Sequence, residues 1–201
     1  MSKTRLEAFS DGVMAIIITI MVLELKIPQG TNWNTIEPLL PTLGSYVLSF
    51  VFIGIYWGNH HHLLHTLERV NGKIIWANLH LLFWLSLVPV ATGWMGENGF
   101  DSVTVAMYGM LLVCCGVAFN LLGNIISNGH KPEHPFVKVY QQTKIKGVWS
   151  SLLYLASIPL AFVHPGISCG LFALVAILWI VPNKEVEKLL NADESAGASH
   201  P

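Results

Sequence analysis

Charged residues are scarce in this sequence. Only 11% of the 201 residues are Asp, Glu, Lys or Arg, whereas 53% are hydrophobic. A soluble domain has about 25% charged residues, so this composition excludes an ordinary soluble protein and predicts an integral membrane protein. The formal net charge of −1 gives no indication of a nucleic-acid partner.

Cysteine and the common active-site motifs are scarce as well. Cys114, Cys115 and Cys169 all lie within apolar runs, which predicts buried thiols with neither a disulfide framework nor a metal site. The sequence contains no Gly-rich phosphate loop, no Ser/His/Asp order that would place a nucleophile, and no Thr-Val-Gly-Tyr-Gly potassium filter. We therefore expect a protein that is not an enzyme and holds no cofactor or metal. The first apolar stretch contains carboxylates, so we also expect no cleavable signal peptide.

Long apolar segments make up most of the chain. They predict an all-α integral membrane protein with six transmembrane helices in each subunit. The segments are residues 5–27, 39–62, 74–95, 102–127, 147–164 and 166–182. Ten of the eleven Lys and Arg residues fall on one side of this arrangement, and Lys26 is the exception. Because cytoplasmic loops carry the excess of basic residues, we expect both termini in the cytoplasm (N-in, C-in).

The six helices are expected to form a single transmembrane domain over residues 1–190. The small, polar composition of residues 191–201 predicts a disordered cytoplasmic tail. Residues 128–146 are expected to form a long, basic cytoplasmic loop, and residues 30–41 a turn-rich outer loop.

Two small features of the sequence predict how the helices bend and pack. Pro89 is expected to kink the third segment, because proline removes a helical hydrogen bond. Gly54 and Gly58 form a small-xxx-small pair that lets another helix approach the second segment closely.

The first apolar segment is a poor candidate for a helix that faces lipid. Thr4 and Glu7 form a capping box, so we expect the helix to begin at Arg5. Only the stretch from Gly12 to Leu23 is free of charge, and it spans about 18 Å, well short of the ~30 Å hydrocarbon core of a bilayer. We therefore expect the other helices to shield this one, so that it faces the bundle interior or an aqueous path.

Polar residues from three segments lie at a similar depth near the cytoplasmic side. They are Asp11 in the first segment, His60 in the second, and Asn78 with His80 in the third. Lipid would leave such groups without hydrogen-bond partners, so we expect a network inside the bundle. In this network Asp11 is expected to bond with partners among Trp57, His60 and Asn78.

Five histidines of the second and third segments leave a different function open. They are His60, His61, His62, His65 and His80. His61 and His65 are four residues apart and share a helical face, so a membrane protein that binds metal or haem for redox chemistry is an alternative. The stronger expectation is that these histidines bond to neighbours or solvent, because no carboxylate or cysteine cluster accompanies them. A secondary transporter is disfavoured, because no broken helix pair or internal repeat marks a site at the membrane midplane.

A motif near the start of the chain resembles the signature of a known family. The motif is Arg5-x-x-x-Phe9-Ser10-Asp11, and the resemblance continues through Trp57-x-x-His60, Asn78, Pro89, Trp179 and Pro182. The chain thereby resembles the lysosomal potassium channel family (transmembrane protein 175). Animal members carry two six-helix repeats, whereas this chain has one, so it is similar to the prokaryotic form.

The resemblance implies a potassium-selective, leak-like channel in the cell membrane, with K+ and membrane lipids as partners. It implies a homotetramer around a central pore lined by the first helix, in which Ile16 forms the narrowest layer and Thr19, Ile20 and Leu23 lie above it. These four residues fall within about a 100° arc of one helix, and Asp11 lies roughly 140° from Ile16. An apolar constriction offers no ligands to replace water, so it would favour K+ because K+ gives up water more easily than Na+.

Overall fold

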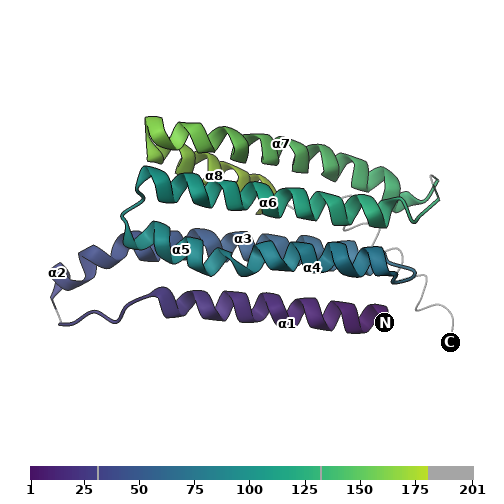
Figure 1. Ribbon diagram of the computed structural model, residues 1–201, viewed down its shortest axis with the longest axis horizontal. Helices are drawn as coiled ribbons and strands as arrows, with labels where there is room; N and C mark the ends of the chain where they lie inside the picture. Colours follow the sequence, from purple (N-terminus) through teal and green to yellow (C-terminus); the bar gives the residue numbers. More distant parts are fainter. Residues whose placement is uncertain (31, 132, 181–201) are drawn as a thin grey trace.

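The structure of the protein, a computed structural model, describes residues 1–30, 32–131 and 133–180. Its helices run side by side along one long axis (Figure 1). In chain order the elements are α1 (Lys3–Met21), the 3-10 turn η1 (Val22–Glu24), α2 (Trp33–Ile36), the 3-10 turn η2 (Glu37–Leu39), α3 (Leu40–His65), α4 (Gly72–Ser86), α5 (Val88–Glu97), α6 (Ser102–Ser127), α7 (Pro135–Val163) and α8 (Pro165–Ile180). The expected all-α class is confirmed. Pro182 and the expected tail over 191–201 lie outside the described residues.

Five stretches of helix are long and apolar enough to cross a membrane. They are Lys3–Glu24, Trp33–His65, Gly72–Glu97, Ser102–Ser127 and Phe136–Val163. The sixth apolar segment forms α8, of which 16 residues are described. At 1.5 Å per residue these extend about 24 Å, slightly less than the hydrocarbon core of a bilayer. The structure therefore supports a membrane protein with several crossing helices, and the count of six remains a prediction.

The first helix begins earlier than its sequence predicts. Ser2 is the N-cap residue, and its Oγ accepts a hydrogen bond of 3.3 Å from the Arg5 N–H. The expected capping box of Thr4 and Glu7 is therefore wrong, because Ser2 already caps the helix and Thr4 lies within its first turn. The side chain of Lys3 donates to the backbone carbonyl of His65, which ties the start of α1 to the end of α3.

The expected loop over residues 128–146 is mostly helix. α7 begins at Pro135 and continues for 29 residues, which is about 43 Å, so it is longer than a bilayer core is thick. Hydrophobicity predicts only the part of a helix that lipid surrounds. The first turns of α7 contain lysines, so they were not predicted to be helical. The outer loop over residues 30–41 is likewise shorter than expected, because helical structure starts at Trp33 and leads directly into α3.

A break divides the third apolar segment where a proline predicts it. α4 ends at Ser86, α5 begins at Val88, and Pro89 lies in the first turn of α5. A helix can accept proline there, because the backbone N–H groups of the first turn have no partner within the helix.

Close helix packing occurs at a different glycine from the expected pair. No other part of the described chain lies within 4 Å of a Cβ added to Gly54 or Gly58. At Gly96 of α5, by contrast, an added Cβ would lie only 2.6 Å from the Thr42 Cα of α3. The α3–α5 pair, and not the Gly54–Gly58 face, is therefore where a glycine allows two backbones to approach within the chain.

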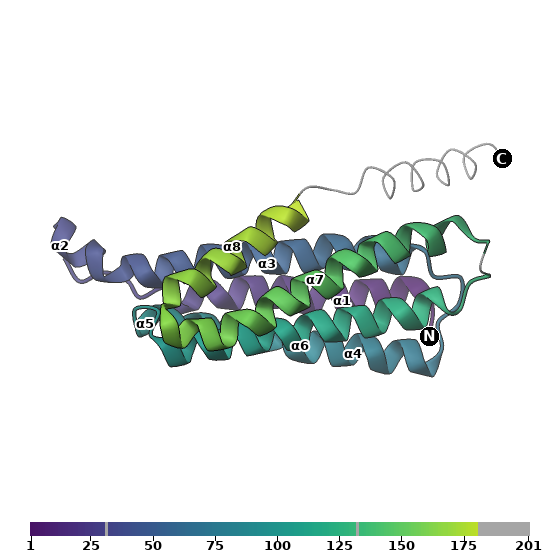
Figure 2. The same ribbon diagram turned by 90° about the horizontal axis from the view of Figure 1, so that it is seen from above.

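The arrangement of the helices places α1 at one side of the bundle. α3, α4 and α5 lie between α1 and the group formed by α6, α7 and α8 (Figures 1 and 2). α1 contacts α3, α4 and α5, and the most extensive contact of the bundle joins α6 to α7. One face of α1 is therefore packed, and the opposite face is open in a single chain.

The end of the bundle that carries Lys26 also holds an ion pair between the segment after η1 and the last residue of α5. Lys26 Nζ lies 2.7 Å from Glu97 Oε1, and both side chains are exposed. The hydrogen bond and the charge of Glu97 raise the pKa of Lys26 above its ordinary value. An exposed pair of this kind contributes little to stability, because water screens it.

Candidate functional site

Polar side chains of α1, α3 and α4 form a hydrogen-bonded chain inside the bundle. The amide Nδ2 of Asn78 donates to Ser10 Oγ at 2.9 Å, and Ser10 Oγ donates to the Leu6 carbonyl at 2.9 Å. On its other side, Asn78 Oδ1 lies 2.7 Å from His60 Nε2. Ser10, His60 and Asn78 are all buried, so this chain links three helices at one level.

The direction of these bonds shows that Nε2 of His60 carries a proton. The oxygen of an amide only accepts, so His60 Nε2 must donate to Asn78, and a neutral ring carries its proton on Nε2. Each donor atom in the chain then has an acceptor. Leaving such a group unpaired in the interior costs about 1–3 kcal/mol, so the three residues depend on one another. Among the described residues, no buried side-chain nitrogen or oxygen lacks a hydrogen-bond partner.

Asp11 lies beside this chain and bonds to α3 and not to α4. Its Oδ1 accepts a hydrogen bond of 2.9 Å from Trp57 Nε1 of α3. The expected contact with Trp57 is therefore present, but Ser10, and not Asp11, reaches Asn78. Adjacent residues of a helix point about 100° apart, so Ser10 faces α4 while Asp11 faces α3. The motif thus joins α1 to two helices at once.

The other two motif residues of α1 lie on its open side. Arg5 and Phe9 are both exposed. Arg5 precedes Ile16 by eleven residues, which places the two within about 20° of one another around the helix. Arg5 therefore lies at the end of the open face, away from the hydrogen-bonded chain.

The histidines of the redox alternative do not converge. His60 is buried and bonded to Asn78, whereas His80 is exposed and accepts a hydrogen bond of 2.9 Å from Trp84 of its own helix. The rings of His61 and His65 lie 6.4 Å apart between centroids. Among residues 1–30, 32–131 and 133–180, the group of three side chains that could hold a metal ion contains none of these histidines. The geometry therefore does not favour a metal or haem centre on α3 and α4.

The implied pore residues share the open face of α1. Ile16, Ile20 and Leu23 are 58%, 44% and 77% exposed, and Thr19 is exposed as well. Ile17 is only 4% exposed and belongs to the core. The other buried residues of the helix are Leu6, Ser10, Met14 and Met21. From Ala8 to Leu23, which lies in η1 directly after α1, every exposed residue is uncharged.

The hydroxyl of Thr19 has a fixed orientation on this open face. Its Oγ1 lies 3.0 Å from both the Ala15 carbonyl and the Ile16 carbonyl of the same helix. The single hydroxyl proton is therefore donated back to the helix. The oxygen lone pairs remain available as acceptors on the open side.

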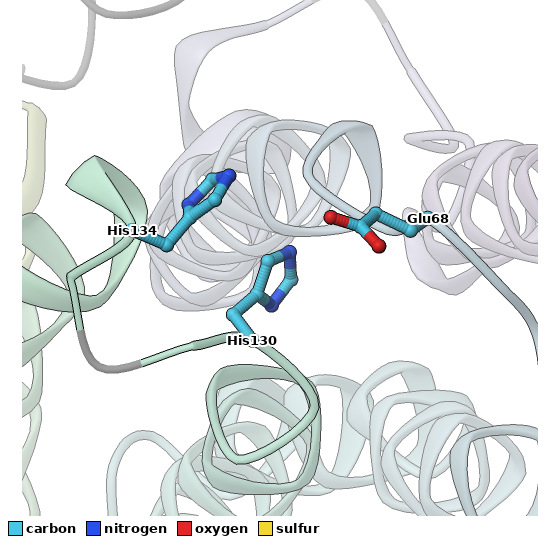
Figure 3. A group of neighbouring side chains, drawn as sticks. All are labelled: Glu68, His130 and His134. Carbon is cyan, nitrogen blue, oxygen red and sulfur yellow. The ribbon is translucent and has the colours of Figure 1, made fainter.

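A group of three side chains that could hold a metal ion lies at the end of the bundle where α1 begins. The sequence alone did not predict this group. One ligand atom from each of Glu68, His130 and His134 lies within 4.8 Å of the others. Figure 3 shows the two imidazole rings and the carboxylate pointing toward one another from two separate connections. The spacing of His130 and His134 is visible in the sequence, but Glu68 is 62 residues away from His130.

Comparison with known proteins places the chain in a family. The family model described as endosomal/lysosomal potassium channel TMEM175 matches residues 5–89, which hold the motif and the hydrogen-bonded chain. A protein of Chryseobacterium sp. named a potassium channel is 49% identical over 190 residues, covering 94% of this chain and 98% of that protein. The chain belongs to the TMEM175 family. The family expected from the motif is thereby confirmed.

Two further TMEM175-family comparisons extend over most of the chain. A potassium channel of Streptomyces collinus is 31% identical over 188 residues, covering 87% of this chain and 90% of that protein. The crystal structure of a lysosomal potassium-selective channel TMEM175 homologue from Chamaesiphon minutus matches with a TM-score of 0.76 at 26% identity. The match covers 89% of this chain and 96% of that one. The likeness therefore includes the whole helical bundle and is not confined to the motif.

Proposed function

We propose that this TMEM175-family protein is a potassium-selective channel, in which four copies surround a central path lined by α1. Its relatives from Chryseobacterium and Streptomyces are named potassium channels, and a structural relative is named a potassium-selective channel. The observation that carries the proposal is the open face of α1. This face is uncharged from Ala8 to Leu23 and has no partner within the described chain.

The length of the uncharged stretch favours an aqueous path over lipid for this face. Glu7 and Asp11 lie near one end of α1, and Glu24 follows the other, so about 18 Å of helix is free of charge. Lipid contact would require about 30 Å. Four copies that place α1 at a shared centre would surround this face with protein and water, and would leave the many exposed apolar side chains of the other helices to lipid.

Selectivity in this proposal comes from incomplete replacement of hydration water. Ile16 is the narrowest layer, and Thr19, Ile20 and Leu23 form the layers above it. Aliphatic side chains supply no ligands to an ion, so the ion that loses water more cheaply, K+, passes more readily. The outward lone pairs of Thr19 would lower that cost for either ion, so such a path discriminates less than a ring of carbonyls.

The distribution of charge supports an orientation in the cell membrane. Most basic residues of the described chain lie at the end of the bundle where α1 begins, and the α3–α4 and α6–α7 connections lie at the same end. Lys26 lies at the other end. By the positive-inside rule, the end that holds the N-terminus and the hydrogen-bonded chain is cytoplasmic. Arg5 then lies at the inner mouth of the path.

Recording from the purified protein in planar bilayers, with K+ on one side and Na+ on the other, tests this function. We expect single-channel currents whose reversal potential is displaced toward the potassium equilibrium potential. A reversal potential at zero would contradict selectivity, and flux that saturates and requires a coupled ion would indicate a transporter instead. Native mass spectrometry of the same preparation should give the mass of four chains.

A further inference from the structure

We propose that Glu68, His130 and His134 form a binding site for a divalent transition metal ion of the Zn2+ type. Glu68 lies in the α3–α4 connection, and both histidines lie in the α6–α7 connection. One ligand atom from each is within 4.8 Å of the others. Two ligands of one tetrahedral zinc ion are about 3.3 Å apart, given bond lengths near 2.05 Å, so a small movement of the side chains closes the site.

The chemistry of the three ligands selects the class of metal. Two imidazoles and one carboxylate are a ligand set that proteins use for zinc, with a water molecule at the fourth position. Mg2+ and Ca2+ prefer sites made entirely of oxygen atoms, so they should bind poorly here. The site takes its ligands from connections and not from the open face of α1, and it is therefore separate from the proposed ion path.

One ring nitrogen of His130 already has the backbone contact that supports a metal-binding histidine. Its Nδ1 lies 3.0 Å from the Ile126 carbonyl at the end of α6. A hydrogen bond from one ring nitrogen to a backbone carbonyl is the usual support for a histidine that binds metal through the other nitrogen. That other nitrogen, Nε2, lies 2.9 Å from the Thr66 carbonyl. Metal binding at Nε2 keeps the ring proton on Nδ1, where it donates to the Ile126 carbonyl, and exchanges the Thr66 contact for a coordination bond.

His134 is half-buried and lies directly against His130. The centroids of the two rings are 4.6 Å apart. The Nδ1 atom of His134 accepts a long hydrogen bond of 3.3 Å from the Phe136 N–H at the start of α7. Binding metal through Nε2 moves the ring proton to Nδ1 and gives up this contact, which is a small loss because the bond is long.

A metal ion at this site would cross-link the α3–α4 connection to the α6–α7 connection. The carbonyl of Thr66, which His130 contacts, follows the carbonyl of His65, which Lys3 contacts. The end of α3 is therefore held from α1 on one side and from the α6–α7 connection on the other. A bound ion would strengthen the second attachment.

Titration of the purified full-length protein with Zn2+ alone, followed by calorimetry, tests the site. We expect one saturable site per chain, and at least tenfold weaker binding in both Glu68→Gln and His134→Gln. Glu68 is exposed, so E68Q should fold normally. The affinity of E68Q therefore tests the proposal even if His134→Gln fails to fold. The matched control is His61→Gln, which removes a histidine from the same end of the bundle and should change the affinity less than twofold.

The electronic spectrum of bound Co2+ and the midpoint of thermal unfolding are independent readouts. Co2+ bound to two histidines and a carboxylate should give visible absorption bands that are lost in E68Q and H134Q and kept in H61Q. Zn2+ should raise the midpoint of the unmodified protein and not that of E68Q, because an ion that binds the folded state stabilises it. Absence of saturable binding, equal affinity in E68Q and the unmodified protein, or loss of binding in H61Q would overturn the proposal. None of these measurements depends on ion flux, so the result is independent of the proposed channel function.

Discussion

The indole of Trp57 donates a hydrogen bond of 2.9 Å to the carboxylate of Asp11, and this bond joins α3 to α1. The same stretch of α1 is joined to α4 through Ser10 and Asn78. Two consecutive residues therefore fix both the position of α1 and its rotation about its own axis. If α1 lines the path, this rotation decides which side chains an ion meets.

Replacing Trp57 by Phe should destabilise the protein while leaving ion preference nearly unchanged. The variant removes the donor to Asp11, and hydrogen bonds to a charged group contribute about 1.5–3 kcal/mol. Thermal unfolding of the purified protein measures the loss. Trp76→Phe is the matched control, because Trp76 is an exposed tryptophan of the neighbouring helix α4, and it should have little effect. A stable W57F variant with altered selectivity would show that Asp11 acts on the ion path directly.

The buried bond between His60 and Asn78 should appear as a coupling in a double-mutant cycle. Asn78→Leu leaves the His60 Nε2–H without an acceptor, and His60→Leu leaves the Asn78 oxygen without a donor. Each variant should cost about 1–3 kcal/mol beyond its change in packing. The double variant leaves neither group of this bond unpaired, so it should cost less than the sum by about 0.5–3 kcal/mol. Additive losses in unfolding free energy would contradict the inferred dependence.

Sequence reasoning predicted the fold where hydrophobicity alone defines an element. The segment 102–127 became α6 with the same bounds, and the break near Pro89 is present. The prediction failed where a helix extends beyond the membrane into water, as at the start of α7. Lysine-rich turns there lack the hydrophobic residues on which the prediction depended. The network was predicted at the right depth, and the expected bond between Asp11 and Trp57 is present, but Ser10, and not Asp11, reaches Asn78. Depth follows from the position of a residue along the helix, whereas its partner depends on how the helix is rotated about its axis. The group around Glu68 depends on two distant connections meeting, which no local pattern records.

The contact of α5 with α3 should be sensitive to a single methyl group. Gly96→Ala would place a Cβ 2.6 Å from the Thr42 backbone, so the helices must move apart. We expect a loss of about 1–3 kcal/mol in unfolding free energy. Gly54→Ala is the control, because nothing in the described chain occupies that space, and alanine favours a helix by about 1 kcal/mol over glycine. If G54A destabilises the assembly instead, another subunit packs against that face of α3.

Both ends of the chain should lie on the cytoplasmic side. The expectation rests on the basic residues at the end of the bundle where α1 begins, and on an even number of crossings. Reporter fusions at Ser2 and after Pro201 should give the same location. Opposite locations would mean an odd number of crossings and would contradict the predicted six helices.

Neighbouring isoleucines of α1 provide the sharpest test of the proposed path. Ile16 is 58% exposed and Ile17 is 4% exposed, so they separate an effect on ions from an effect on packing. In a fourfold assembly, Ile16→Ala would widen one layer on all four sides and let ions keep more water. The permeability of Na+ relative to K+ should therefore rise several-fold, and Ile16→Asn should raise it further, because its amides also solvate ions.

Ile17→Ala should instead cost about 2–5 kcal/mol of stability and leave the permeability ratio nearly unchanged, since it opens a cavity in the core. Reversal potentials under mixed K+ and Na+ gradients measure the first effect, and thermal unfolding measures the second. A change in selectivity from I17A and none from I16A would mean that the helix presents its other face to the ion. That outcome would also require the bonds of Ser10 and Asp11 to be rearranged in the assembled channel, because they hold Ile17 toward the core.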